Sequence, residues 1–205
     1  MNGRIYPFLG TFVIAVFCAI GSCFGFPEFG ISKAALAKGE WFTIFTFMFI
    51  HQGAEHLIIN LAALILAGAI ANEIGFSNKA FLAIFFTVGL TSVFLALPFT
   101  SSILAGASAG IYGIFGAMAV KLGDYGMSVP KVLGVLAIAA AGSSLIETPL
   151  VNSTETVLRL SVHLAALFLG AIFFLGARRK WVPRGRRLAR KVSAMKHSSR
   201  DRSHA

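Results

Sequence analysis

The sequence predicts an all-α membrane protein, a bundle of six transmembrane helices, and three observations lead to this prediction. Of the 205 residues, 57% are hydrophobic and only 13% are charged, whereas soluble domains carry about 25% charged residues. The apolar residues are gathered in runs near the length of about 20 residues that a helix needs to cross a bilayer. The basic residues are concentrated after the last run, with 11 of the 18 Lys and Arg following residue 177.

Five apolar runs predict membrane spans directly, at residues 7–26, 80–97, 103–122, 130–146 and 157–176. The run at 103–122 is the glycine-rich one. Residues 41–71 are apolar almost throughout and are too long for one upright helix. We interpret their first part, WFTIFTFMFI, as lying at the membrane interface, where Trp and Phe are favourable. Residues 51–71 are then the second of six spans.

The basic C-terminal segment predicts the orientation of the bundle. An even number of spans puts both termini on one side, and the positive-inside rule makes that side cytoplasmic. We expect one six-span domain over residues 1–177 and a disordered basic cytoplasmic tail over 178–205. The tail is expected to contact anionic lipid rather than nucleic acid, although an RNA- or ribosome-binding tail is the alternative. The predicted location is an inner (plasma) membrane, of bacterial type.

Neither a disulfide framework nor a metal or other cofactor is predicted. Cys18 and Cys23 both fall in the first span and are expected to be buried packing residues. Three histidines, His51, His56 and His163, could ligate a metal ion, but they lack the H-x-x-x-H spacing of a helical zinc site. His51 is instead assigned a structural role at the start of the second span.

Polar residues inside membrane spans are functional candidates because burying them in lipid is costly. Ser108 is the single serine of GASAGIYGIFGA. It follows an uncharged loop, PFTSSILA, which could enter the membrane if other protein groups satisfy the hydrogen bonds of its backbone. His56 and Asn60 are four residues apart, so they share one face of the second span. His163 lies in the sixth span. Together these side chains suggest a site near the outer side of the membrane.

The residue types fit nucleophilic catalysis. A serine hydroxyl attacks well only when a base such as His163 removes its proton. The resulting oxyanion needs donors, which His56, Asn60 and the Ser108 backbone N–H, at the start of a helix, could supply. Tyr112 is four residues after Ser108 and could stack on the imidazole. With Glu73 and Asp124 expected at the cytoplasmic ends, no buried acid completes a triad, so a Ser–His dyad is predicted.

At these motifs the sequence resembles the rhomboid family of intramembrane serine proteases. GEWFTIFTFMFIHQGAEHLIINLAAL, GASAGIYGIFGA and SVHLAALFLG resemble three family motifs in the expected order. The resemblance implies Ser108 as nucleophile, His163 as base, His56 and Asn60 as oxyanion donors, and Tyr112 packed on the base, in a cavity open to the outer side. The chain departs from the family pattern at the following positions, without touching the dyad: Ala109 after the nucleophile, Phe42 and Thr43 in the first loop, and Ala166 with Gly170 as the small pair after the histidine.

The function implied by the resemblance is a serine endopeptidase that cleaves single-pass transmembrane proteins in or near their membrane segment. Its partners would be these substrates and membrane lipids, and it would act as a monomer or weak oligomer. The alternative is a catalytically inactive rhomboid-like protein that binds membrane clients. A small transporter is a third class, but it leaves the setting of Ser108 unexplained and lacks visible repeats.

Overall fold

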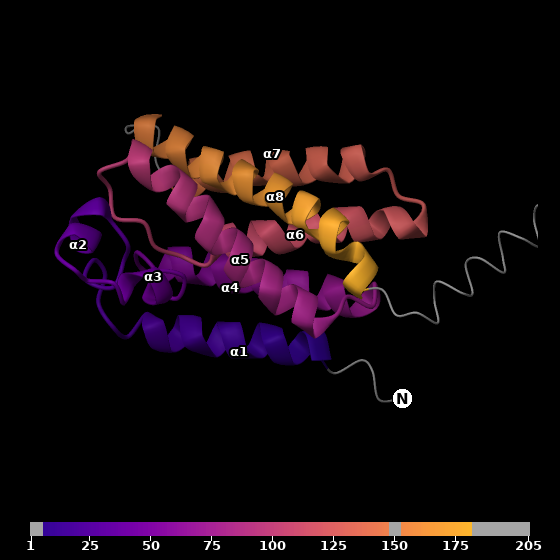
Figure 1. The fold of residues 1–205 in the computed structure, drawn as a ribbon, viewed down its shortest axis with the longest axis horizontal. Coiled ribbons are helices and arrows are strands. Elements are labelled where there is room, and N and C mark those ends of the chain that lie inside the picture. The colour runs from indigo at the N-terminus through magenta and orange to yellow at the C-terminus, as the bar shows by residue number, and fades with distance from the viewer. Residues whose placement is uncertain (1–5, 148–152, 182–205) are drawn as a thin grey trace, which may run out of the picture. The chain divides into compact units, whose positions relative to one another are not determined.

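A computed structural model describes residues 6–147 and 153–181, and most of the described part is helical (Figure 1). Its longer helices are α1 (Tyr6–Gly21), α4 (Ala54–Glu73), α5 (Asn78–Ala96), α6 (Ser108–Leu122), α7 (Val129–Glu147) and α8 (Ser153–Trp181). Its short elements are α2 (Lys33–Ala37), α3 (Thr43–Thr46), and the 3₁₀ turns η1 (Leu97–Phe99) and η2 (Gly123–Tyr125).

The chain divides into a unit over residues 1–175 and a second unit over 176–205. The first unit carries every residue considered below. Most of the predicted basic tail, 178–205, falls outside the described residues, and its separation at residue 177 stays a prediction.

The predicted class, an all-α membrane protein, is confirmed. Within the described residues, three segments are long and apolar enough to cross a membrane, namely Ala54–Glu73, Asn78–Phe99 and Thr154–Ala177. Two shorter apolar helical segments accompany them, Leu9–Gly21 and Val129–Leu145. The helices that match the six predicted spans are therefore present, while six complete membrane crossings remain a prediction.

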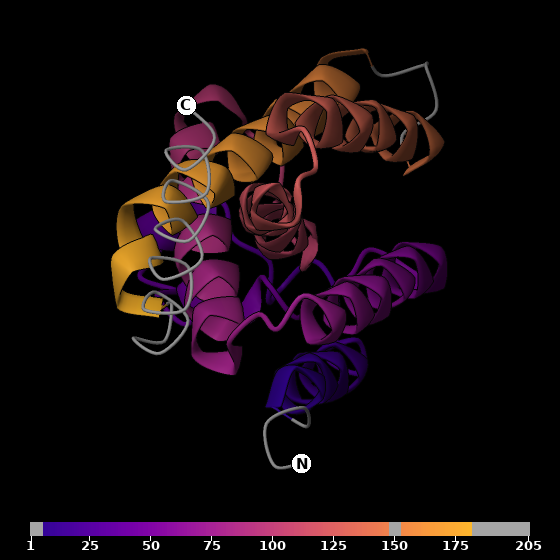
Figure 2. The same cartoon turned by 90° about the vertical axis from the view of Figure 1, so that its right-hand side faces the viewer.

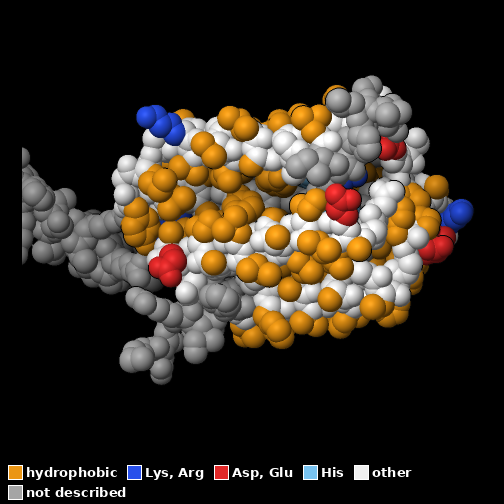
Figure 3. Space-filling view, turned by 180° about the vertical axis from the view of Figure 1, so that it is seen from behind, with side chains coloured by type: hydrophobic (Ala, Val, Ile, Leu, Met, Phe, Trp, Pro, Cys, Tyr) orange, Lys and Arg blue, Asp and Glu red, His pale blue; other side chains and the backbone are white. Residues whose placement is uncertain are grey.

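The outer surface of the first unit is the kind of surface that faces lipid. Large apolar side chains project outward, with Phe12 65% exposed, Ile138 75% and Ile172 64%. Figure 3 shows such side chains over much of one face, where charged side chains are few and most of them lie toward its ends. A continuous apolar surface of this extent is unfavourable in water, so it agrees with a membrane environment.

The second predicted span begins later than expected. Helix α4 starts at Ala54, after Gly53 with a backbone φ of 89°, so His51 precedes the helix instead of opening it. Residues 41–50, predicted to lie at the interface, form the short helix α3 flanked by turns. A positive φ is accessible mainly to glycine, which explains why the helix cannot extend back to residue 51.

Helix α6 lies at the centre of the first unit. Figure 2, an end view, shows it surrounded by α4, α5, α7 and α8. Twelve of its residues are buried, from Ala109 to Lys121 with only Tyr112 excepted in that stretch. A helix that is apolar and small-sided all round is expected in such a position, and the glycines of GASAGIYGIFGA are the reason that the neighbours come close.

Helices α6 and α8 pack backbone against backbone. A Cβ atom added to Gly170 would overlap the carbonyl of Gly113, and one added to Gly116 would overlap the carbonyl of Leu167. Ala166 beside them is fully buried. Small residues permit this close approach in membrane helices, so the Ala166 and Gly170 pair serves here as glycine pairs do.

The α5–α6 loop is fastened to the segment before α4. Ile31 and Leu104 exchange two backbone hydrogen bonds of 2.9 and 2.8 Å, and the Gly106 N–H donates to the Phe47 carbonyl at 2.8 Å. These bonds satisfy the backbone groups of Leu104 and the N–H of Gly106, which is the kind of pairing that a loop within the membrane's depth needs. They also hold the residues immediately before Ser108 in place.

The opposite end of the bundle carries its own polar contacts. The Tyr125 hydroxyl donates to the Ile74 carbonyl at 2.8 Å, and Lys121 lies 3.3 Å from the Asp124 carboxylate. The expectation that both cysteines are buried is wrong for one of them. Cys18 is buried but Cys23 is exposed, because α1 ends at Gly21 and Cys23 falls in the turn that follows.

Candidate active site

Ser108 is the first residue of α6. The loop bonds just described deliver it to this position, where it is half-buried. The first N–H groups of a helix have no acceptor within the helix. The Ser108 hydroxyl and its own backbone N–H therefore stand together at the helix start, without bulky side chains from the neighbouring glycine and alanines.

His163 meets Ser108 from α8. Its Nε2 atom lies 3.0 Å from the Ser108 Oγ, across a separation of 55 residues in sequence. The imidazole is only 2% exposed. The distance is that of a hydrogen bond, and the glycine contact between α6 and α8 makes it possible, because Gly170 lies seven residues, or two turns, after His163 on the same helix face.

Tyr112 lies against the imidazole, one turn after Ser108 on α6. The two rings stack with centroids 4.5 Å apart and planes 30° from parallel. The Tyr112 hydroxyl lies 2.8 Å from the Ser143 hydroxyl on α7. The second ring nitrogen of His163, Nδ1, lies 3.1 Å from the Oγ of Ser144, also on α7.

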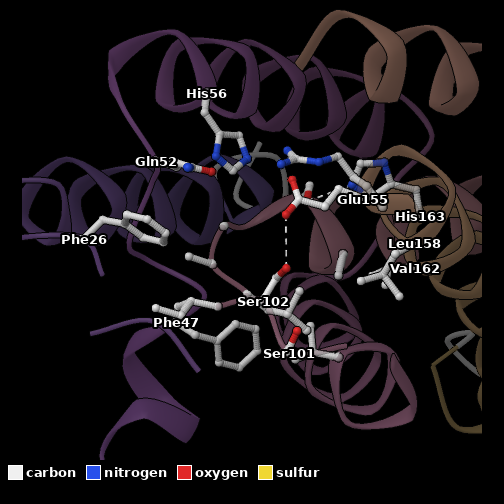
Figure 4. A pocket seen from close by; sticks show the side chains of 18 residues that line it. Phe26, Phe47, Gln52, His56, Ser101, Ser102, Glu155, Leu158, Val162 and His163 are labelled. Carbon is white, nitrogen blue, oxygen red and sulfur yellow. Dashed lines mark hydrogen bonds between the residues drawn. The ribbon is translucent and has the colours of Figure 1, made fainter. Parts of the chain in front are cut away.

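A cavity of about 410 Å³ opens beside Ser108 and His163. Its walls come from the segments before α4, from α4, from the α5–α6 loop and from the first turns of α8. Figure 4 shows His56 and His163 reaching it from different helices, with Phe26 and Phe47 on a more apolar side. A water-accessible hollow next to a serine–imidazole pair is what hydrolysis by a serine nucleophile requires. A carbonyl group must reach the hydroxyl, and water must then reach the acyl carbon beside the imidazole.

His56 lines this cavity from the first turn of α4 and is 7% exposed. Its ring meets that of His51 edge to face, with centroids 5.1 Å apart. His51 Nδ1 lies 3.2 Å from the Phe49 carbonyl, and the ring lies in the turn before α4. His51 thus lies just before the start of α4, where a structural role was predicted for it.

Asn60 is placed differently from the other candidates. It is 3% exposed, and its side-chain amide donates to the His56 carbonyl one turn earlier at 2.9 Å. The residues that line the cavity include His56 but not Asn60. Because an amide NH₂ has two hydrogens, the second remains for another acceptor, but reaching an oxyanion beside Ser108 requires the side chain to turn toward the cavity.

Charged residues at the mouth of the cavity were missed as site residues by the sequence analysis. Glu155 and Arg159 on α8 both line the cavity, and the Ser102 hydroxyl donates to Glu155 at 3.1 Å (Figure 4). Neither residue was among the candidates that the sequence suggested. The signal was their spacing, because Glu155, Arg159 and His163 repeat every four residues and so share a helix face.

The described residues were also considered as ligands of a metal ion. Among residues 6–147 and 153–181, no group of three His, Cys, Asp or Glu side chains is arranged to hold a metal ion. The carboxylates that the sequence analysis considered as triad members, Glu73 and Asp124, lie at the end of α4 and in η2, at the far end of α6 from Ser108.

Gly106 is the residue at which a small change should damage the cavity most directly. Its φ of +121° is poorly accessible to other residues, and an added Cβ would lie 2.8 Å from the His56 Cε1 and 3.0 Å from its Nε2. Gly106→Ala is expected to cost about 1–3 kcal/mol of stability and to displace His56. Thermal unfolding in detergent micelles measures the first effect, and the rate at which a serine-reactive fluorophosphonate probe labels the protein measures the second.

Gly126→Ala is the matched control for this change. Gly126 has a φ of +84°, but a Cβ there would meet nothing within 4 Å. Gly126→Ala should lower the stability about as much as Gly106→Ala does, and the labelling rate should stay at the wild-type value. Equal rates in the two alanine variants would show that the space beside His56 is unimportant.

The fold and the site together define a class: a helical membrane protein that buries a hydrogen-bonded serine–histidine pair next to a cavity. Comparison with known proteins then identifies the family. A sequence profile of the rhomboid domain matches residues 38–180, which is more than half of the chain, and the chain belongs to the rhomboid family. The resemblance found in the sequence motifs is thereby confirmed.

A curated relative is the rhomboid protease GluP of Bacillus subtilis (strain 168). The two proteins are 35% identical over 91 residues, which make up 44% of this chain and 18% of the relative. The chain therefore matches less than a fifth of that protein's length.

Proposed function

We propose that this chain is an intramembrane serine endopeptidase that cleaves single-pass transmembrane proteins in or near their membrane segment. The observation that carries the proposal is the 3.0 Å contact between His163 Nε2 and Ser108 Oγ at the edge of a cavity. Membership of the rhomboid family and the similarity to a rhomboid protease support it.

The proposed chemistry follows from the two side chains. His163 Nε2 takes the hydroxyl proton of Ser108 as the Oγ attacks a peptide carbonyl carbon, and the carbonyl oxygen becomes an oxyanion. The Ser108 N–H and the His56 side chain are donors close to that position, and Asn60 is the further candidate if its free N–H turns toward the cavity. His163 then gives the proton to the leaving amine, and water hydrolyses the acyl-enzyme.

The proposed substrate is a transmembrane helix because the catalytic groups are embedded in an apolar bundle. The carbonyls of an intact helix are engaged in i→i−4 bonds, so cleavage requires local unwinding. Segments containing Gly or Pro unwind at the lowest cost. We therefore expect cleavage near such residues.

The proposed location is a bacterial inner membrane with both chain termini in the cytoplasm. The cavity lies where α6 and α8 begin, whereas Lys79 and Lys131 lie at the starts of α5 and α7 and Lys121 at the end of α6. These lysines are at the end of the bundle away from the cavity. By the positive-inside rule, the cavity then opens to the outer side.

Reaction with a fluorophosphonate probe tests the proposal, because an activated serine oxygen attacks the phosphorus of such a probe, displaces fluoride and becomes phosphonylated. We expect the folded protein in detergent to be labelled at Ser108, as mapped by peptide mass spectrometry, and His163→Ala and heat-unfolded protein to be labelled little. In right-side-out vesicles, a probe that does not cross the membrane should label equally well. Absence of labelling in folded protein would instead favour a client-binding protein without catalytic activity.

A further inference from the structure

The second ring nitrogen of His163, the proposed catalytic base, contacts a buried hydroxyl where a catalytic triad would have an acid. His163 Nδ1 lies 3.1 Å from the Oγ of Ser144 on α7. Ser144 is fully buried, at 0% exposure, and His163 is 2% exposed. The contact is thus shielded from solvent and joins α7 to α8 directly behind the imidazole.

The hydroxyl proton of Ser144 is committed elsewhere. Ser144 Oγ lies 2.8 Å from the carbonyl oxygen of Ala140, one turn earlier on α7. A carbonyl oxygen has no hydrogen to give, so the hydrogen in this bond is the serine's own. The serine oxygen is left with lone pairs, which accept hydrogen bonds.

With the Ser144 hydrogen on the Ala140 carbonyl, the proton between Ser144 and His163 comes from the imidazole. A neutral imidazole carries one N–H, and if it is on Nδ1 the other nitrogen, Nε2, is an acceptor. Nε2 is the atom 3.0 Å from the Ser108 hydroxyl. The chain of donors therefore runs from Ser108 to Nε2 and from Nδ1 through Ser144 to the Ala140 carbonyl.

We propose that Ser144 is a positioning residue for His163, which holds the imidazole in the Nδ1–H tautomer through the buried Ser144–His163 contact so that Nε2 faces Ser108 as a base. This inference rests on the proposed function. In the reaction, the Ser108 proton moves to Nε2 as Oγ bonds to the carbonyl carbon, and the Nδ1–H stays on its nitrogen, hydrogen-bonded to Ser144. No proton leaves the imidazole toward Ser144.

A hydroxyl suits this place better than a carboxylate. A carboxylate at a fully buried position inside an apolar bundle would carry a large desolvation cost. The Ser144 oxygen accepts the same bond without a net charge. The stacked ring of Tyr112, 4.5 Å away, fixes the plane of the imidazole, whereas Ser144 fixes which nitrogen carries the proton.

The first test uses the unmodified protein. Nitrogen-15 NMR of histidine-labelled protein, with the signal assigned by comparison with His163→Ala, distinguishes a protonated from an unprotonated ring nitrogen. We expect His163 in the folded wild type to carry its proton on Nδ1. A proton on Nε2 instead would overturn the proposal, whether or not the protein cleaves a substrate.

The second test compares two buried serines. Ser144→Ala is expected to lower kcat by about 10- to 100-fold, the range for losing a hydrogen bond to a group that becomes charged, with little change in KM because Ser144 does not line the cavity. The NMR spectrum of this variant should show a mixture of tautomers. Ser144→Thr keeps the hydroxyl and should restore most of kcat.

Ser92→Ala is the matched control. Ser92 is 1% exposed, and its hydroxyl donates to the carbonyl one turn earlier, Val88, at 2.7 Å, but it lies on α5 without a histidine partner. It should lose similar stability and keep its kcat. Equal losses of kcat in Ser144→Ala and Ser92→Ala, or an unchanged kcat in Ser144→Ala, would overturn the proposal. If the wild-type protein carries the Nδ1–H tautomer but neither cleaves a substrate nor reacts with the probe, the proposed function is refuted while the role of Ser144 in holding the tautomer stands.

Discussion

Ser108→Ala is expected to abolish cleavage of a transmembrane substrate while leaving the protein folded. The alanine lacks the oxygen that forms the acyl-enzyme, and no other described hydroxyl is hydrogen-bonded to His163 Nε2. Removing the nucleophile of a serine hydrolase lowers kcat on the order of 10⁴- to 10⁶-fold. The stability cost is expected to be small, about 1 kcal/mol for one hydrogen bond. Cleavage of a reconstituted model substrate and thermal unfolding measure the two quantities.

Ser161→Ala provides the control for this experiment. Ser161 lies on α8 two residues before His163, is exposed, and donates to the Val157 carbonyl of its own helix at 2.8 Å. Its loss should change neither cleavage nor unfolding appreciably. Wild-type rates in the Ser108 variant would contradict the assignment of Ser108 as nucleophile and leave the family membership intact.

Gly170→Val is expected to produce the largest loss of stability. The added side chain would collide with the backbone of Gly113 on α6, and backbone atoms of a central helix cannot move aside as the end of a flexible side chain can. Overpacking of this kind costs about 1–3 kcal/mol or more. Helix α8 must tilt or separate from α6, and His163, two turns away on the same face, moves from Ser108.

Two measurements separate the consequences for Gly170→Val. The unfolding midpoint in detergent should fall. The rate of probe labelling per folded molecule should also fall below that of the wild type. Gly170→Ala should give a smaller loss of both. Gly134→Ala, on α7 with nothing within 4 Å of the added Cβ, should be neutral or slightly stabilising. Full labelling by folded Gly170→Val would show that the close helix contact does not position the base.

The helices of the bundle were predictable because lipid imposes a simple rule on composition. Apolar runs must be long enough to bury a backbone whose polar groups find no water, and each predicted run corresponds to a helix. The prediction was wrong at the start of α4, where Gly53 has a positive φ. Hydropathy does not encode backbone dihedral angles, so residues 41–50 can be largely apolar and still not join α4 in one continuous helix.

The candidate site was predictable in its residue types and not in its contacts. Ser108 and His163 stood out because polar residues are rare in apolar spans. Ser144 did not, because serine is tolerated in membrane helices when it bonds its own backbone, and only the approach of α7 reveals its second partner. Arg159 and Glu155 were likewise not among the predicted site residues, since sequence alone does not show that the first turns of α8 line the cavity.

The sequence by itself determined that this protein is a helical membrane protein, where its apolar helices run, and which few polar groups lie among them. It did so because burying charge and unpaired backbone in lipid costs several kcal/mol per group, which leaves a strong pattern along the chain. The tertiary structure decided which of these groups meet. A hydrogen bond depends on tenths of an ångström and on which face of each helix turns inward, and here the backbone contact of Gly113 with Gly170 brings α6 and α8 close enough for Ser108 and His163 to touch.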